Sequence, residues 1–180
     1  ARDGIDFFPL LVDFESKYYA ACRMKGSRFI KREGRPGEAA TLIARMIDRP
    51  MRPLFPKGMQ NDVQIVASLL QTDEKHSASA MAICAASMAI QLSGIPFETP
   101  VGAVRVGMDN SGKFILNPTF DQAEKGNLDL LVAGTEDAIT MVEAGANLIT
   151  NDQMLSALEF AHSSIKEICQ AQTEFGKQFK

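Results

Sequence analysis

The chain has 180 residues, of which 46% are apolar and 23% are charged, and its net charge is −3. A chain of this length can form one domain with a hydrophobic core, and it contains no run of about eighteen apolar residues that would predict a membrane span. Its three cysteines are far apart and form no Cys-x-x-Cys pair, which predicts no metal site and favours buried thiols in a reducing cytoplasm.

The first half of the sequence predicts two strands and two helices. Residues 5–14 place apolar side chains on one alternating face, which is typical of a strand, and the basic stretch that follows is rich in glycine and predicts a loop. Residues 38–49 predict a helix that ends at Pro50, with an apolar stripe formed by Leu42, Ile43, Met46 and Ile47. Residues 63–70 predict a second strand, and the small residues of 77–92 predict a nearly buried helix.

The second half predicts two β-hairpins and a long helix. Strand-like runs at 101–107 and 113–116 flank an Asp-Asn-Ser-Gly turn, and runs at 128–133 and 138–143 flank Gly-Thr-Glu-Asp. Thr150 and Gln153 then form a capping-box pattern at the start of the helix. Strands and helices are mixed without an internal repeat, so the predicted fold class is α+β, or α/β with a mixed sheet.

Positive charge is concentrated between Arg23 and Lys57. This stretch holds ten of the nineteen Lys and Arg residues against three acids, a net charge of +7, so the rest of the chain carries −10. A basic stretch with an aromatic residue between its cations suits single-stranded RNA, because cations meet phosphates and rings stack on bases. The candidates are Phe29, Lys31 and Arg32, with Arg45, Arg49 and Arg52 as weaker ones. The alternatives are a solvated loop with Phe29 in the core and, for the three weaker arginines and above all for Arg45, ion pairs with Asp48 or other acids.

Other candidate residues give weaker signals. His76 and His162 are the only histidines and are far apart, so a histidine mechanism is the less favoured interpretation for both. Cys84 lies within an apolar helical pattern and is interpreted as a core thiol. Ser77 and Ser79 could bind a phosphate, whereas N-capping of the following helix is the simpler interpretation.

Several ordered motifs resemble a known family. The motifs are Asp6-Phe7-Phe8-Pro9-Leu10, Lys31-Arg32-Glu33-Gly34-Arg35-Pro36, Ile47-Asp48-Arg49-Pro50-Met51-Arg52-Pro53-Leu54-Phe55-Pro56, Ser93-Gly94-Ile95-Pro96, Leu116-Asn117-Pro118-Thr119 and Asp129-Leu130-Leu131-Val132-Ala133-Gly134-Thr135-Glu136. Together they resemble the first RNase PH-like core of bacterial polynucleotide phosphorylases. The resemblance implies a β-α-β-α core in residues 1–150 that lacks its first strands, and a closing helix in 151–180. A chain of this kind is expected to be part of a longer protein.

The family resemblance also implies an activity and an assembly. The family consists of processive, phosphate-dependent 3′→5′ exoribonucleases that act in mRNA degradation, with three subunits forming a ring around a channel for single-stranded RNA. Phe29, Ile30, Lys31 and Arg32 match the family's channel loop, although Ile30 replaces a second aromatic residue, and Arg35 joins the expected RNA contacts. Mg²⁺ and inorganic phosphate are expected as cofactors of the whole enzyme, in a second core, and none is expected in this chain.

The family's active core carries a pattern that this chain lacks. The pattern is Asp-x5-Asp-x-Lys before Val-Ala-Gly, and its carboxylates hold a divalent metal. Here the second Asp is Asp129, the first position is Ala123 beside Glu124, and the Lys position is Leu131. The resemblance therefore implies a non-catalytic core in which Asp129 is structural. The rival hypotheses are an active phosphorolase that uses Asp129, Glu124, Ser77 and Ser79, and a purely structural assembly domain.

Overall fold

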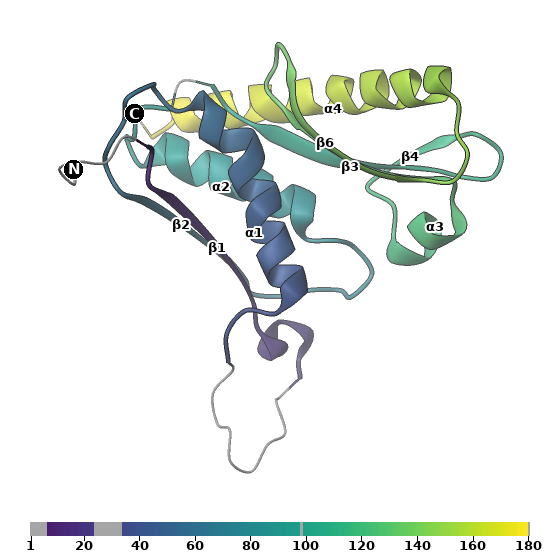
Figure 1. Cartoon of the computed structure of the whole chain (residues 1–180), viewed down its shortest axis with the longest axis horizontal. Helices are drawn as coiled ribbons and strands as arrows, with labels where there is room; N and C mark the ends of the chain where they lie inside the picture. The colour runs from purple at the N-terminus through teal and green to yellow at the C-terminus, as the bar shows by residue number, and fades with distance from the viewer. Residues whose placement is uncertain (1–6, 24–33, 98, 180) are drawn as a thin grey trace.

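The computed structural model of the chain describes residues 7–23, 34–97 and 99–179 (Figure 1). Its elements form four layers, in the order sheet, helices, sheet, helix. One cluster of buried apolar side chains lies on each face of the second sheet, one toward the first two helices and one toward the last helix. The elements are β1 (Leu10–Ser16), η1 (Tyr18–Ala21), α1 (Glu38–Met51), η2 (Arg52–Leu54), β2 (Val63–Leu69), α2 (Ser79–Leu92), β3 (Gly102–Met108), β4 (Phe114–Leu116), α3 (Phe120–Lys125), β5 (Leu128–Gly134), β6 (Ile139–Ala146) and α4 (Asn151–Lys177). This mixed arrangement confirms the predicted fold class.

The first layers come from the first half of the chain. Strands β1 and β2 pair in parallel, with Leu10 opposite Val63, so the chain must cross over between them, and α1 makes that connection. Side chains alternate along both strands, so that Leu10 and Phe14 are buried while Leu11 is 54% exposed. The buried face of this small sheet rests on α1 and α2 (Figure 1).

Helix α1 differs from its prediction in two respects. The helix continues through Pro50 to Met51, because a proline in the last turn removes only one intrahelical hydrogen bond and its ring is buried. The buried stripe consists of Ala40, Ala44, Ile47, Pro50 and Met51. Leu42, which we predicted on this stripe, is 48% exposed, because a residue two positions from both Ala40 and Ala44 lies on the opposite side of a helix.

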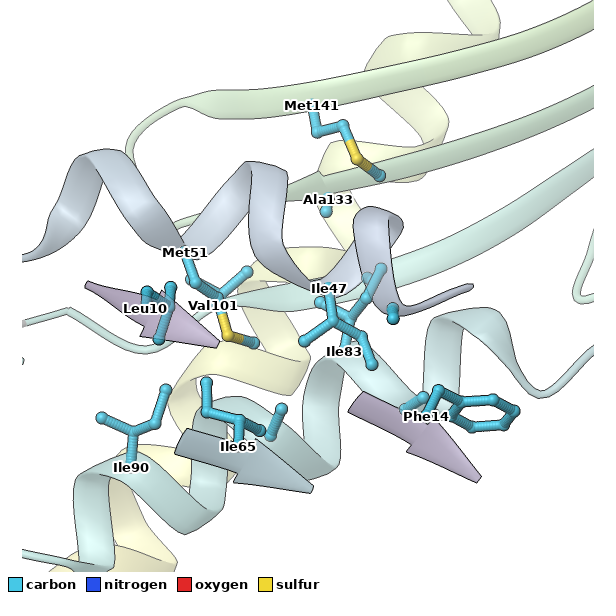
Figure 2. Packing of buried hydrophobic residues seen from close by; sticks show 14 of the residues in the cluster. Leu10, Phe14, Ile47, Met51, Ile65, Ile83, Ile90, Val101, Ala133 and Met141 are labelled. Carbon is cyan, nitrogen blue, oxygen red and sulfur yellow. The ribbon is translucent and has the colours of Figure 1, made fainter. Parts of the chain in front are cut away.

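The larger cluster of buried side chains lies between the two sheets. Figure 2 shows Ile47 and Met51 of α1 in this cluster, together with Leu10 of β1 and the side chains of Ile83 and Val101. Leu131, Ala133 and Met141 complete the cluster from the second sheet. Burial of this kind is the main favourable term in folding, at roughly 25 cal/mol for each Å² of apolar surface removed from water.

The second sheet is antiparallel, with strand order β4-β3-β5-β6, and it confirms both predicted hairpins. Its central strands bury both faces. Val104, Val106, Leu130 and Val132 point toward Ala161 and Ile165 of α4, and Ala103 and Leu131 point toward α1 and α2. The predicted capping box is confirmed, since Thr150 Oγ1 accepts from Gln153 N and Gln153 Oε1 accepts from Thr150 N.

A buried hydrogen-bond group joins three elements that are far apart in the sequence. Ser87 Oγ of α2 donates to Gln172 Oε1 of α4 at 2.8 Å and accepts from Val101 N at 2.8 Å. Gln172 Nε2 donates to Val101 O at 2.9 Å, which closes the group. Ser87 and Gln172 are buried, and these bonds satisfy their polar atoms.

Within the described part of the chain, no helix is both long enough and apolar enough to span a membrane.

Candidate functional site

The predicted RNA-binding residues fall into two groups. Phe29, Ile30, Lys31 and Arg32 lie outside the described residues, so their contacts with RNA stay a prediction. Arg35 is described, and it is an exposed residue shortly before α1. Among the described residues Arg35 forms no ion pair.

The three arginines at the end of α1 have different surroundings. Arg52 donates to both carboxylate oxygens of Asp48, at 3.1 and 2.6 Å, and to the carbonyls of Phe8 and Leu10. Arg49 pairs with Glu143 of β6 at 3.3 Å. Arg45 is exposed and makes no ion pair within the described ranges. The ion-pair alternative is therefore confirmed for Arg49 and Arg52 and wrong for Arg45, for which we favoured it most. Arg52 therefore ties α1 to β1, whereas Arg45 faces solvent.

A polar pocket lies where the second sheet meets α1 and the start of α2. We call it the sheet pocket. It has a volume of about 250 Å³ and is lined by Ile43, Met46, Ser77, Ser79, Arg105, Asp129, Leu131, Glu143, Ala144 and Gly145. The sheet register explains the grouping, because Leu131 is opposite both Arg105 and Glu143, and Asp129 is opposite both Gly107 and Gly145. These residues alternate with the apolar ones under α4, and so they share one face.

An ion pair occupies the floor of this pocket. Arg105 Nε donates to Asp129 Oδ1 at 2.6 Å, and Arg105 Nη2 donates to Asp129 Oδ2. The side chains are only 24% and 32% exposed, and the hydrogen bond with Asp129 raises the pKa of Arg105 above its ordinary value. A two-point contact of this type fixes both groups. Both carboxylate oxygens of Asp129 are therefore bound by Arg105.

The sheet pocket brings together some of the predicted phosphate and catalytic residues. Ser77 and Ser79 line it with Asp129, and their hydroxyls lie 3.0 Å apart. The N-cap position of α2 is Ala78 rather than a serine, and it forms no side-chain cap. Ser77 Oγ nevertheless accepts from the N–H of Ser79, the first residue of the helix, at 3.4 Å, so our N-capping interpretation holds only for this one bond. Glu124 lies on the exposed surface of α3, and neither it nor Ala123 lines the pocket. Arg105, which the sequence analysis did not single out, is the pocket residue that pairs with Asp129.

The divalent metal of the resembled family does not fit these residues. A hard cation needs several oxygen ligands with available charge. In the sheet pocket Asp129 is held by Arg105, Glu143 is paired with Arg49, and the apolar Leu131 lies directly opposite Glu143. Over the described ranges, no group of three His, Cys, Asp or Glu residues is arranged to hold a metal ion.

The histidines and cysteines lie outside the sheet pocket. His76 Nδ1 is 2.6 Å from Asp73 Oδ2, and this hydrogen bond holds the pKa of Asp73 well below its ordinary value. His162 Nε2 is 3.2 Å from the carbonyl of Thr135. Cys84 and Cys169 contact backbone groups around β3, and burial raises the pKa of both thiols, that of Cys169 to about 11. Cys22 is exposed, which differs from the expectation of buried thiols.

The layered fold recurs in a solved structure, and family models assign the chain to a protein family. The rice protein Rrp46 has the same fold, with a TM-score of 0.75 over 98% of this chain and 78% of that one, at 12% sequence identity. Models of the 3′ exoribonuclease family match the chain in two parts, domain 1 at residues 1–96 and domain 2 at residues 99–164. The chain belongs to the 3′ exoribonuclease family.

Curated relatives identify a more specific group within this family. The polyribonucleotide nucleotidyltransferase of Finegoldia magna is 53% identical over 180 residues, and that of Gloeobacter violaceus is 52% identical over 179. The matches cover 98% and 99% of this chain but only 25% of each relative. The enzyme of Halothermothrix orenii is 49% identical over 177 residues. These relatives confirm the resemblance to polynucleotide phosphorylases, and the chain spans about a quarter of their length.

Proposed function

We propose that this chain is a non-catalytic core of a phosphate-dependent 3′→5′ exoribonuclease, and that it guides single-stranded RNA and contributes to a trimeric ring. The proposal rests on the sheet pocket. Its one aspartate at a predicted catalytic position is paired with Arg105, and Leu131 stands where the resembled active core has lysine. Without a free carboxylate pair and a cation, such a pocket cannot hold a metal against the reacting phosphodiester.

The RNA-guiding part of the proposal rests on the basic stretch. Lys31 and Arg32 are the expected phosphate contacts, with Phe29 and Ile30 against bases, and Arg35 beside them in the sequence. Arg45 and Arg49 extend the same charge along α1, while Arg52 is the weakest candidate because its guanidinium already makes four hydrogen bonds. Mg²⁺ and inorganic phosphate would serve the whole enzyme outside this chain.

Titration of the chain with a fluorescent single-stranded RNA tests both parts. In phosphate and Mg²⁺ we expect binding that weakens with salt, without release of nucleoside diphosphates. The variant Lys31→Ala/Arg32→Ala should bind more weakly and should reduce the slope of log K against log salt by about 1.4, because each phosphate contact on a single strand contributes about 0.7. A control with the same charge change is Lys166→Ala/Lys177→Ala, on the exposed side of α4. Equal slopes in both variants would remove the loop from the proposal.

The active phosphorolase remains the second candidate, because Ser77, Ser79 and Asp129 do line one pocket. This candidate requires nucleoside diphosphate release that survives repurification and disappears in Asp129→Ala.

A purely structural role in assembly is tested with the loop variant Lys31→Ala/Arg32→Ala, by analytical ultracentrifugation. Loss of trimers in Lys31→Ala/Arg32→Ala would favour assembly, whereas retained trimers with weaker RNA binding would favour RNA guiding.

A further inference from the structure

A second polar hollow lies apart from the sheet pocket, at the end of β1. It has a volume of about 620 Å³, against about 250 Å³ for the sheet pocket, and we call it the β1 cleft. Its walls come from the end of β1, the η1 turn and its flanking residues, the segment before α1, the first turn of α1 and one loop residue. They consist of Glu15, Ser16, Lys17, Tyr18, Ala21, Arg23, Gly34, Arg35, Pro36, Gly37, Ala39, Ala40 and Glu74. This volume is in the range of small-ligand sites.

The charges of the β1 cleft leave one cation in excess. Arg23 pairs with Glu74 at 2.9 Å, and Lys17 pairs with Glu15 at 3.7 Å. Arg35 has no such partner among the residues that the structure describes, so the described walls carry a net charge of +1. The excess charge favours an anionic ligand near Arg35.

An aromatic side chain lines the same cleft. Tyr18 is 49% exposed, so a large part of its surface is accessible to a ligand. Tyrosine offers an aromatic face for a base together with a polar hydroxyl, at a low cost in side-chain entropy. A ring and a cation in one cleft are the combination that binds single-stranded nucleic acid.

Backbone hydrogen bonds hold this aromatic residue in position. Arg23 N donates to Tyr18 O at 3.0 Å, and Ala20 N donates to Lys17 O at 3.1 Å. Ala20 is buried, and its carbonyl accepts from Thr72 N at 2.9 Å, which ties the turn to the loop after β2. Because these bonds fix the backbone of the turn, binding of a base to the ring requires ordering of the side chain only.

We propose that the β1 cleft receives one nucleotide of single-stranded RNA, with its base on Tyr18 and its phosphate near Arg35. The proposal rests on the proposed RNA-guiding function and adds a contact to it. Arg23 and Arg35 border, in the sequence, the residues that carry the predicted loop contacts, so RNA held there would have the cleft within reach. Stacking tolerates any base, so the cleft selects single strands rather than a sequence.

Substitutions at two neighbouring tyrosines test the proposal. Tyr19 is 54% exposed on the same turn but does not line the cleft. Tyr18→Ala should weaken binding of a fluorescent oligoadenylate by about 5- to 150-fold without changing the salt slope, since one stacked base is lost. Tyr18→Phe and Tyr19→Ala should stay within about twofold. Arg35→Ala should reduce the salt slope by about 0.7.

Cross-linking of the unmodified chain provides a readout that does not depend on variant folding. With 4-thiouridine RNA we expect a photoadduct on Tyr18 or on the other cleft residues, located by mass spectrometry. RNA binding in which Tyr18→Ala behaves like Tyr19→Ala, or adducts that avoid the cleft, would overturn the cleft and leave the proposed function standing. Absence of any salt-dependent RNA binding would instead overturn both.

Discussion

Arg105 on β3 holds Asp129 on the neighbouring strand β5 by both carboxylate oxygens, at the floor of the sheet pocket. The pair is half-buried, at 24% and 32% exposure, whereas the Arg49–Glu143 pair at the pocket rim is 58% and 46% exposed. The chain therefore contains one half-buried and one exposed arginine–carboxylate ion pair, so that the contribution of each pair to stability can be compared at two levels of solvent screening.

Double-mutant cycles should separate the two ion pairs. We expect a coupling free energy of about 1–3 kcal/mol for Arg105→Ala with Asp129→Ala, measured by urea unfolding. For Arg49→Ala with Glu143→Ala the expected coupling is below about 1 kcal/mol, because exposed pairs are screened by water and salt. Equal couplings would mean that Asp129 is not structurally held.

The buried hydrogen-bond group predicts a large effect for a small substitution. Ser87→Ala leaves Val101 N and Gln172 Oε1 without their bonds to the hydroxyl, and it should lower the free energy of unfolding by about 1–3 kcal/mol. Ser163→Ala is the control, because its hydroxyl donates to Phe160 O on the exposed side of α4. There the change should stay within about 0.5 kcal/mol, because the carbonyl can bond to water instead.

Two glycines of the second sheet should respond differently to alanine. A Cβ on Gly134 would lie 2.5 Å from Ala138 O and 3.0 Å from Ile139 Cα, so the β5–β6 turn must shift. We expect Gly134→Ala to lower the free energy of unfolding by about 1–3 kcal/mol. A Cβ on Gly145 meets nothing closer than Asp129 O at 4.0 Å, so Gly145→Ala should be nearly neutral. Similar midpoints for both variants in thermal unfolding would contradict the packing at Gly134.

The three thiols should differ in reactivity. Cys22 is exposed, whereas burial raises the pKa of Cys84 and raises that of Cys169 from 9.0 to about 11. In native buffer at pH 8 a thiol reagent should modify the exposed Cys22 rapidly, the half-buried Cys84 more slowly and the buried Cys169 slowest, and no rapid phase should remain in Cys22→Ser. Rapid modification of two or three thiols would show that the helices around β3 open.

The raised pKa of Cys169 also predicts a dependence of stability on pH. A group that binds its proton more tightly in the folded state contributes fully below the pKa of the unfolded state, and this contribution is lost as the pH rises through the folded-state pKa. The free energy of unfolding should therefore fall between about pH 9 and pH 11. Cys169→Ala should flatten this dependence in urea titrations, although it lowers stability at every pH by leaving a cavity.

Local signals in the sequence predicted most of the elements, and non-local contacts explain what was missed. The Thr150–Gln153 capping box and the Asp109–Gly112 turn involve residues within four positions, and both hairpins and α4 are present. The sequence contains a second capping-box pattern, Thr119 with Gln122, which we did not use and which would have predicted the start of α3. The burial of Leu42 was predicted wrongly because we placed the large apolar residues on the buried face of α1. In the structure that face is formed at its start by the small residues Ala40 and Ala44.

The candidate site depended on contacts that sequence spacing does not reveal. Ser77 and Asp129 are 52 positions apart, and Arg105 is 24 positions before Asp129. They meet only because β3 and β5 pair in one register and α2 begins beside them. The family motifs directed attention to Asp129 and Leu131, but they said nothing of the arginine that pairs with the carboxylate.

Strand β3 passes between two different environments, and its order of side chains fixes the alignment of the whole sheet. Val104 faces the dry layer under α4, and the next residue, Arg105, faces the sheet pocket. A slip of one residue would move the guanidinium beneath α4, away from Asp129, and would turn Val104 toward the polar side. A buried charge without its partner costs several kcal/mol, so that alignment is strongly disfavoured. Arg105 therefore also helps to specify the register in which β3 pairs with β5.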